Sequence, residues 1–246
     1  MRFKLAVLVL AFAATGAAAE SVQVAVAANF AGTARMLAEQ FAGQGGQRLE
    51  LSSGSTGKFY AQIKNGAPFD VFLSADEATP LRLESEKLAI AGSRFTYAIG
   101  RLVLWSAQPG LVDERGEVLR KGRFNRLAIA NPKLAPYGAA AQETLEKLGL
   151  WGELRPKLVQ GENIAQTFQF VSSGNAELGL VALSQIRDAG KPPSGSYWLV
   201  PAPLHAPLRQ DAVLLARAER NPAAQAFLAY LRSGPARALI RAYGYE

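Results

Sequence analysis

The chain has 246 residues, no cysteine, and 27 Lys and Arg against 20 Asp and Glu, which gives a net charge of +7. The lack of cysteine excludes disulfides, thiolate metal sites and thiol nucleophiles. The length suits two lobes of about 100 residues, each large enough to bury a core of its own.

The first 19 residues have the pattern of a signal peptide. Arg2 and Lys4 make a basic start, an apolar stretch follows, and the AAA triplet at 17–19 offers a cleavage site. We expect cleavage after Ala19, which lowers the net charge to +5 because Arg2 and Lys4 are lost. The apolar stretch is too short for a membrane anchor, and no cysteine is available for a lipid anchor. The sequence therefore predicts an exported periplasmic protein without a membrane anchor.

Strand and helix patterns alternate after the signal peptide, which favours a mostly parallel α/β architecture. In VQVAVAA (22–28) the three valines fall on one face of a strand. The next segment has helical spacing of Phe30, Ala34, Leu37 and Phe41. A second helix begins after Thr56 and ends at Asn65-Gly66, and DVFLSAD (70–76) is a buried strand.

The pattern changes near residue 100. A strand (RLVLWS, 101–106) is followed by LAIAN (127–131), a helix through 140–147, a helix from about Ile164, and the strand ELGLVAL (177–183). The Pro- and Gly-rich segment 190–210 indicates a return crossing. The last elements expected are a strand over 211–218 and two amphipathic helices around Phe227, Leu231, Leu239 and Ile240.

Two crossings, near 99–101 and 203–208, predict two lobes joined by a two-stranded hinge. Lobe 1 would contain residues 20–99 and 208–246, and lobe 2 residues 100–207. Hinges of this kind suit closure around a ligand. In open α/β sheets the ligand lies beyond the carboxyl ends of the strands.

Four stretches share one pattern, a strand followed by small or polar residues and then a helix. They are VAVAANF (24–30), LELSSGSTGKF (49–59), LAIANPKLAPYG (127–138) and GENIAQTF (161–168). A helix N-terminus presents unpaired N–H groups and about half a positive charge. Four that meet at one point would offer about +2 from main chain alone. The sequence thus predicts a site for a small dianion that needs no Lys or Arg.

Asn29 ends the first of these strands and has two interpretations. Its side-chain oxygen can cap the helix that follows, or its amide NH2 and the nearby backbone N–H groups can point toward an anion.

The segment Gly54-Ser55-Thr56-Gly57-Lys58 also has more than one interpretation. Ser55 or Thr56 can be a plain N-cap, or the segment can form an anion nest of hydroxyl and N–H donors. A phosphate-binding P-loop does not fit, because Gly54 and Gly57 are too close together in the sequence.

Tyr137 follows Pro136, a residue suited to the start of a helix. Its ring can pack on the wall of the cleft, or its N–H or hydroxyl can donate to an anion. Ile164 can donate only through its backbone.

An enzyme must also be considered. Ser55 and Lys58 match the S-x-x-K motif of penicillin-recognising enzymes, residues 173–175 match S-x-N, and residues 232–234 loosely imitate K-T-G. The second match lies where a helix should end, and the third lacks both the Lys and the Thr. His205 is the single histidine, which leaves no triad or metal cluster. We expect no enzyme, no catalytic residue and no metal or other cofactor.

The motifs VAVAANF, GSTGKFYAQIKNGAPFDVFLSAD (54–76), LAIANPKLAPYGAAAQETLEKLGLW (127–151) and the region 162–186 together resemble the periplasmic molybdate-binding proteins of ABC importers. The resemblance covers nearly the whole mature chain. It implies a type II periplasmic binding fold in which neutral donors hold molybdate or tungstate between the lobes. It also implies a membrane permease as partner. We expect a monomer that does not bind nucleic acid, since basic residues are scattered and the chain is exported.

The resemblance implies that five residues bind the oxyanion: Ala28, Asn29, Thr56, Tyr137 and Ile164. Part of the family has a Tyr after the L-G-x-V sequence, whereas Ala182 stands there in this chain. The lost hydroxyl suggests the branch in which the Asn of the first loop compensates. Receptors for sulfate or for a ferric complex stay open as alternatives.

Overall fold

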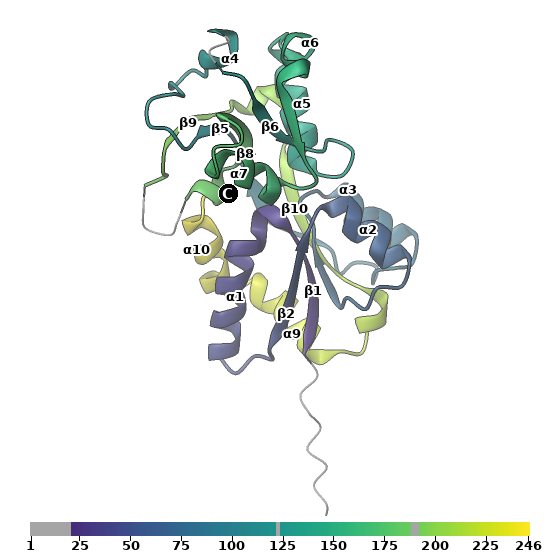
Figure 1. Cartoon of the computed structure of the whole chain (residues 1–246). Helices are drawn as coiled ribbons and strands as arrows, with labels where there is room; N and C mark the ends of the chain where they lie inside the picture. The colour runs from purple at the N-terminus through teal and green to yellow at the C-terminus, as the bar shows by residue number, and fades with distance from the viewer. Residues whose placement is uncertain (1–20, 122–123, 188–191) are drawn as a thin grey trace, which may run out of the picture.

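The computed structural model describes residues 21–121, 124–187 and 192–246. These residues form two lobes, one above the other in Figure 1. The predicted signal peptide and its cleavage site after Ala19 lie outside the described residues. Over the part that is described, the helices are too short or too polar for any of them to span a membrane.

Lobe 1 is built on a five-stranded sheet of order β2-β1-β3-β10-β4. Its strands are β1 (Val22–Ala27), β2 (Leu49–Gly54), β3 (Val71–Leu73), β4 (Phe95–Gly100) and β10 (Leu208–Leu214). Its helices are η1 (Ala28–Phe30), α1 (Ala31–Gly43), α2 (Thr56–Lys64), α3 (Ala78–Ser85), η4 (Ala216–Ala218), α9 (Pro222–Leu231) and α10 (Gly234–Ala242).

Lobe 2 is built on a second five-stranded sheet of order β7-β6-β8-β5-β9. Its strands are β5 (Leu102–Ser106), β6 (Leu127–Ala130), β7 (Leu158–Gly161), β8 (Leu178–Ala182) and β9 (Ser196–Leu199). Its helices are α4 (Val118–Lys121), α5 (Pro136–Lys147), α6 (Trp151–Leu154), η2 (Arg155–Lys157), α7 (Ile164–Ser172), α8 (Leu183–Ile186) and η3 (Ala202–Leu204).

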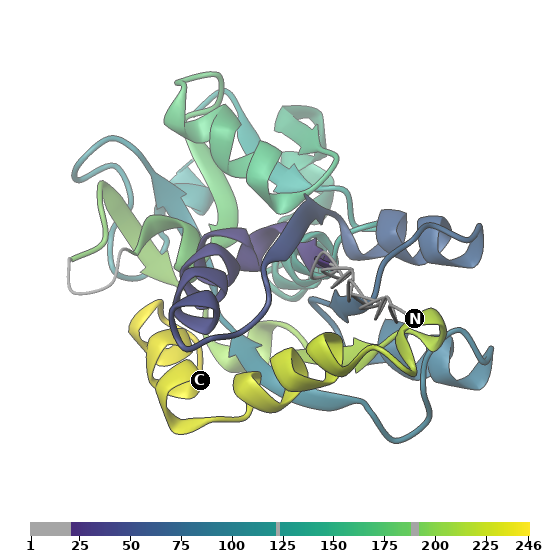
Figure 2. The ribbon, with the colours of Figure 1, turned by 90° about the horizontal axis from the view of Figure 1, so that it is seen from below.

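Each sheet is covered by helices on both faces. In lobe 1 the three valines of β1 pack with Phe30 and Leu37 on the face of α1, α9 and α10. Ala25, which points the other way, packs with Phe59 and Leu83 from α2 and α3. Figure 2 shows α1 and α10 on the opposite side of lobe 1 from α2 and α3. The period of two in the sequence therefore separates two apolar layers.

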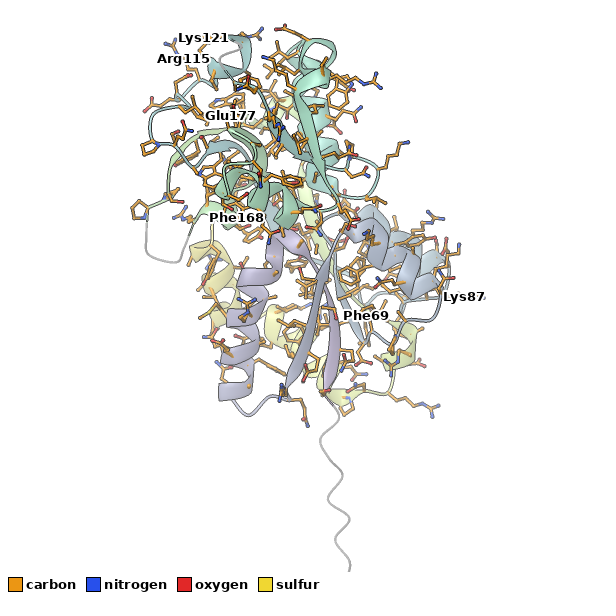
Figure 3. All side chains as sticks on the ribbon, viewed as in Figure 1. Phe69, Lys87, Arg115, Lys121, Phe168 and Glu177 are labelled. Carbon is orange, nitrogen blue, oxygen red and sulfur yellow. The ribbon has the colours of Figure 1, made fainter. Side chains whose placement is uncertain are left out.

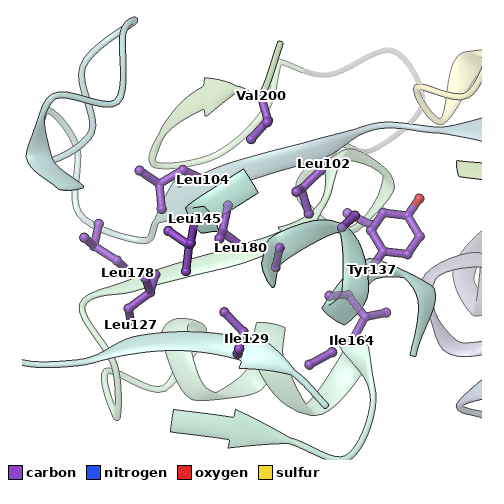
Figure 4. Close-up of a cluster of buried hydrophobic side chains, with 14 of the residues drawn as sticks. Leu102, Leu104, Leu127, Ile129, Tyr137, Leu145, Ile164, Leu178, Leu180 and Val200 are labelled. Carbon is purple, nitrogen blue, oxygen red and sulfur yellow. The ribbon is translucent and has the colours of Figure 1, made fainter. Parts of the chain in front are cut away.

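Lobe 2 follows the same plan. Leucines of β5, β6 and β8 pack with Tyr137 and Leu145 of α5 on one face (Figure 4). On the other face Val103 and Trp105 pack with Val171 of α7. This arrangement fixes α5 and α7 against their strands, and both helices begin at the site.

One strand in each sheet runs against the others. β10 is antiparallel to β3 and β4, and β5 is antiparallel to β8 and β9. The chain enters β5 directly from β4 and enters β10 on its return from β9, so each reversed strand follows a crossing between lobes. The two-lobed α/β fold with mostly parallel sheets is therefore confirmed. The residue boundaries of the lobes given above stay a prediction.

Several element limits differ from the sequence prediction. The strand expected over 211–218 is β10, which begins at Leu208 beside Gly100 and ends at Leu214, while residues 216–218 form η4. The strand expected over 70–76 is only β3, three residues long. β9 lies inside the segment that was expected to be a plain crossing, where it pairs with β5.

Candidate functional site

Four helix starts meet where the carboxyl ends of the two sheets face each other. Ala27 pairs with Gly54 at the ends of β1 and β2, and Ala130 pairs with Gly161 at the ends of β6 and β7. Because these strand ends are in register, the helices that follow start at the same edge of each sheet. The N–H of Gly57 donates to Leu134 O across the seam between lobes, at 2.9 Å.

A small cavity lies at this seam, with a volume of about 10 Å³. We call it the central cavity. It is lined by Ala27, Ala28, Asn29, Gly54, Ser55, Thr56, Ala75, Ala135, Pro136, Tyr137, Asn163 and Ile164. All five residues predicted to bind the oxyanion are among them, from both lobes. None of the lining residues is charged, so any positive potential must come from the main chain and from polar hydrogens.

The first turn of α2 shows how one donor is left for the cavity. Ser55 is the N-cap, as one of the predictions had it, and its Oγ accepts from the N–H of Lys58 at 3.4 Å. The N–H of Gly57 is used by Leu134 O. Thr56 Oγ1 accepts from the N–H of Ala75 at 3.1 Å. Within the described part of the chain, the N–H of Thr56 has no acceptor, and it opens the helix at the cavity.

The start of α5 leaves one donor in the same way. Pro136 has no N–H, and the N–H of Gly138 turns back to Ala135 O at 2.8 Å. No described residue accepts from the N–H of Tyr137. A Cβ on Gly138 would lie 2.4 Å from Ala130 O, so glycine lets this turn sit directly on the end of β6.

The hydroxyl of Tyr137 bonds to a residue of lobe 1. It accepts from Gln210 Nε2 at 3.2 Å, and in Figure 4 it points out of the apolar cluster of lobe 2. Burial raises the pKa of this phenol well above its ordinary value, so it stays neutral. Of the two predicted donors on Tyr137, the N–H is the one that lies at the start of α5, beside the cavity.

The N-cap of α7 is Asn163, whose side chain bonds to the first turn of the helix. Asn163 Oδ1 accepts from the N–H groups of Ala165 and Gln166, at 2.9 and 3.1 Å. The N–H of Ile164, the first residue of the helix, has no acceptor among the described residues. Asn163 thus caps the two N–H groups that follow Ile164, and the use of the Ile164 N–H by a ligand stays a prediction.

Asn29 differs from both predictions for its side chain. It caps no helix, because Ala27 precedes η1 and no side-chain cap is present. Its Nδ2 donates to Gln210 Oε1 at 2.9 Å and to the hydroxyl of Tyr245 at 3.2 Å. The amide NH2 is therefore occupied inside lobe 1. Asn29 and Ala28 line the cavity at the start of η1, and their backbone N–H groups have no acceptor among the described residues.

Gln210 was not recognised from the sequence as part of the site. It is fully buried on β10, accepts from Asn29 and from Tyr97, and donates to Tyr137. One side chain thus joins a site residue of lobe 1 to a site residue of lobe 2. No local motif marks it, because its partners lie far away in the chain.

A larger groove opens beside the central cavity and leads outward. It shares Thr56, Ala75, Ala135 and Pro136 with the cavity and has a volume of about 370 Å³. Its charged lining residues are Asp76, Glu77, Lys133, Glu143 and Arg209. Other charged side chains lie farther out: Figure 3 shows Arg115, Lys121 and Lys87 at the outer edges of the lobes.

The motifs that suggested an acyl-enzyme do not form one site. Lys58 Nζ bonds to Glu162 Oε2 at 2.6 Å rather than to Ser55. Ser233 caps α10, and Ser173 is exposed at the end of α7. His205 Nδ1 faces only Ala206 O, at 2.7 Å. Among the described residues, no three His, Asp or Glu side chains cluster as metal ligands.

Ala182 ends β8, and its N–H donates to Gln185 Oε1 at 3.0 Å. The position therefore offers no hydroxyl, as the sequence departure predicts. The same Gln185 donates through Nε2 to Ile164 O at 2.9 Å, which ties the end of β8 to the start of α7.

Comparison with known proteins gives consistent matches. Residues 22–246 match the family model of the bacterial extracellular solute-binding proteins. Molybdate-binding protein ModA of Azotobacter vinelandii is 55% identical over 249 residues, which cover 100% of this chain and 99% of that protein. Molybdate-binding protein ModA of Rhodobacter capsulatus is 48% identical, with 93% and 89% covered. The solved structure of the Azotobacter vinelandii periplasmic molybdate-binding protein superposes with a TM-score of 0.90 at 45% identity, over 92% of this chain and 99% of that one.

Proposed function

The chain belongs to the bacterial extracellular solute-binding proteins, and from this premise we propose that it is a molybdate receptor of an ABC importer. The observation that carries the proposal is the central cavity. Four helix starts place N–H groups that have no acceptor among the described residues around one space between two lobes, and the side chains that line it are uncharged. The protein is a binding receptor and not an enzyme.

We propose that the oxyanion accepts from the main-chain N–H groups of Ala28, Asn29, Thr56, Tyr137 and Ile164. The first three belong to lobe 1 and the last two to lobe 2, so the anion would bridge the lobes. Each helix start adds about half a positive charge, which together offset the two negative charges of the ligand. Because no Lys or Arg is among the lining residues, the helix dipoles provide the positive potential that attracts the anion.

The donors also explain how the receptor selects its ligand. Molybdate is fully deprotonated at neutral pH and only accepts hydrogen bonds. Hydrogen phosphate carries a proton that needs an acceptor, and a buried group left unmatched costs about 1–3 kcal/mol. Sulfate also only accepts, but as the smaller anion it does not reach donors on both lobes at once. Tungstate is nearly isosteric with molybdate and should bind comparably.

Binding should close the lobes and create the surface that a membrane permease recognises. The bonds that already cross the seam, from Gly57 to Leu134 and from Lys58 to Glu162, favour the closed arrangement. The solved relative is described as periplasmic, and we propose the same location for this chain after cleavage at Ala19. We also propose that it acts as a monomer.

Calorimetry and thermal melting with separate ions test the proposal. We expect heat release and a raised melting temperature with molybdate and with tungstate, because a ligand that binds only the folded state stabilises it. Sulfate and phosphate should give neither at equal concentration. No heat and no melting shift with molybdate would reject the proposal, and a response to sulfate alone would favour a sulfate receptor. Native mass spectrometry of protein from its own periplasm would read the bound ion directly.

A further inference from the structure

Tyr245 lies between the two lobes, beyond the end of α10. Gly244 precedes it with φ +89°, a left-handed conformation that glycine adopts without strain. A Cβ on Gly244 would lie 3.1 Å from the side chain of Leu183 in lobe 2, so glycine lets this segment run against the other lobe. The ring of Tyr245 is buried edge-on to Phe30, with centroids 5.3 Å apart.

The hydroxyl of Tyr245 takes part in a closed loop of hydrogen bonds on Asn29. Asn29 Nδ2 donates to the Tyr245 hydroxyl at 3.2 Å, and that hydroxyl donates to Ser184 Oγ at 2.9 Å. Ser184 Oγ donates to the main-chain O of Asn29 at 3.0 Å. The Tyr245 hydroxyl also lies 2.8 Å from Asn29 O, as a second acceptor. Burial raises the pKa of Tyr245, which keeps the proton in this loop.

The loop crosses from one lobe to the other. Ser184 belongs to α8 of lobe 2, whereas Asn29 and Tyr245 belong to lobe 1. The two bonds of Ser184 therefore form only when the lobes are together, while the bond between Asn29 and Tyr245 survives their separation. Glu246 holds the segment in place, because its N–H and O pair with Ile99 near the first crossing.

The loop holds Asn29, which lines the central cavity and whose N–H has no acceptor among the described residues. Asn29 is fixed at its side chain by Gln210 and Tyr245, and at its carbonyl by Ser184 and Tyr245. With both the side chain and the carbonyl held, the Cα of Asn29 and the backbone nitrogen bonded to it are held in place. Bonds in such a loop polarise one another, so removing one member weakens the rest.

We propose that Tyr245 is a positioning residue for anion binding: with Ser184 it fixes Asn29 at the cavity and fastens that residue to lobe 2 once the lobes are closed. The proposal rests on the molybdate-binding function proposed above. It assigns Tyr245 no contact with the ligand. Its effect is on the lifetime of the closed complex.

The variant Tyr245→Phe removes the hydroxyl and keeps the ring against Phe30. We expect the dissociation rate of molybdate, measured by stopped flow with a tungstate chase, to rise about fivefold to tenfold, the size expected for one lost buried hydrogen bond. The association rate should stay within about twofold, because encounter precedes the formation of the loop. Unchanged dissociation would overturn the proposal.

Two further variants make the test specific. Ser184→Ala should raise the dissociation rate to a similar extent, and the double variant should lose little more, since both changes open one loop. If the two increases in dissociation rate multiply fully in the double variant, the two hydroxyls act independently and the proposed loop is wrong. Tyr230→Phe is the matched control, because its hydroxyl bonds to Gln40 within lobe 1 at 2.7 Å, and its rates should equal those of the wild type.

The result can be separated from the proposed function. If the wild-type chain fails to bind molybdate, the receptor function is rejected. If the wild type binds and Tyr245→Phe leaves its dissociation unchanged, only the positioning role is rejected. The melting temperatures of the ligand-free variants are measured in parallel. If Tyr245→Phe melts at a lower temperature than the wild type, the dissociation rate of Ser184→Ala tests the positioning role instead.

Discussion

The backbones of Gly57 and Leu134 touch across the seam between the lobes. The N–H of Gly57 donates to Leu134 O at 2.9 Å, and a Cβ on Gly57 would lie 3.1 Å from that oxygen and 3.2 Å from the Leu134 Cα. Both obstacles are main-chain atoms of the opposite lobe, which cannot swing aside as a side chain can. The lobes meet here because residue 57 has no side chain.

Gly57→Ala should therefore hinder closure without damage to either lobe. We expect molybdate affinity to fall about tenfold or more, because about 1–3 kcal/mol is typical of forced overpacking. Ligand-free melting should change little, since α2 is a helix in which Ala is favoured over Gly. Calorimetry measures the affinity and small-angle scattering the closure. Gly43→Ala, where a Cβ meets nothing within 4 Å, is the control and should bind as the wild type does.

The hydroxyl of Thr56 ties the start of α2 to the segment that follows β3. It accepts from the buried N–H of Ala75, so Thr56→Val leaves that donor unmatched at a nearly constant side-chain volume. We expect the free energy of unfolding to fall by about 1–3 kcal/mol, and molybdate affinity to weaken because the start of α2 shifts. Urea denaturation and calorimetry measure the two effects. Thr56→Ser retains the hydroxyl and should restore most of both, and equal losses in Ser and Val would contradict this role.

The parts of the site that the sequence predicted are local. Ser55, Thr56, Pro136 and Ile164 stand at helix starts, and such starts follow from a strand pattern, a small polar residue and a helical pattern within about ten residues. Gly66 and Gly174, where the sequence indicates helix ends, both have positive φ, as residues after a helix often do. Periodicity likewise placed the valines of β1 on one face.

The parts that were missed depend on distant partners. Asn29 and Gln210 are 181 residues apart, and Asn29 and Tyr245 are 216 apart. Nothing near Asn29 in the sequence shows that its NH2 will be used inside lobe 1 and not by a ligand. The start of β10 was placed too late for the same reason: residues 208–210 become strand only because Gly100 and Ile99 lie beside them.

Binding should not depend on pH between about 7 and 9, because the lining of the central cavity has no acidic or basic side chain. The nearest phenols, Tyr97, Tyr137 and Tyr245, have pKa values that burial raises above the ordinary value of 10. They therefore carry no negative charge that would repel the anion. Calorimetry at pH 7, 8 and 9 measures this. A tenfold change in affinity over that range would reveal a titrating group at the site.

Stability, unlike binding, should change with pH in alkali. Because the folded chain retains these phenolic protons above pH 10 and the unfolded chain releases them, the folded state binds more protons there. The free energy of unfolding is then fully retained below pH 10 and falls as the pH rises further. Thermal melts from pH 8 to 11 should show a constant melting temperature and then a decline. A melting temperature that rises above pH 10 would contradict the sign.

Lys58 and Glu162 bridge the lobes at the surface, with Nζ 2.6 Å from Oε2 and side chains that are 43% and 65% exposed. An ion pair this exposed is worth about 0–1 kcal/mol, so Lys58→Met should weaken molybdate binding by less than about fivefold at low salt. The loss should vanish in about 0.5 M salt, which screens exposed charges. Titrations at both salt concentrations measure it.

The control for this pair lies within lobe 1. Arg48 pairs with Glu50 at 3.0 Å, on side chains that are also exposed, so Arg48→Met removes the same kind of charge away from the seam and should leave affinity unchanged. A Lys58→Met loss well above tenfold that persists in high salt would mean that the ammonium group itself attracts the anion. That result would contradict a pocket that holds a dianion with neutral donors, because a cation beside the ligand would then supply the attraction assigned to the helix starts.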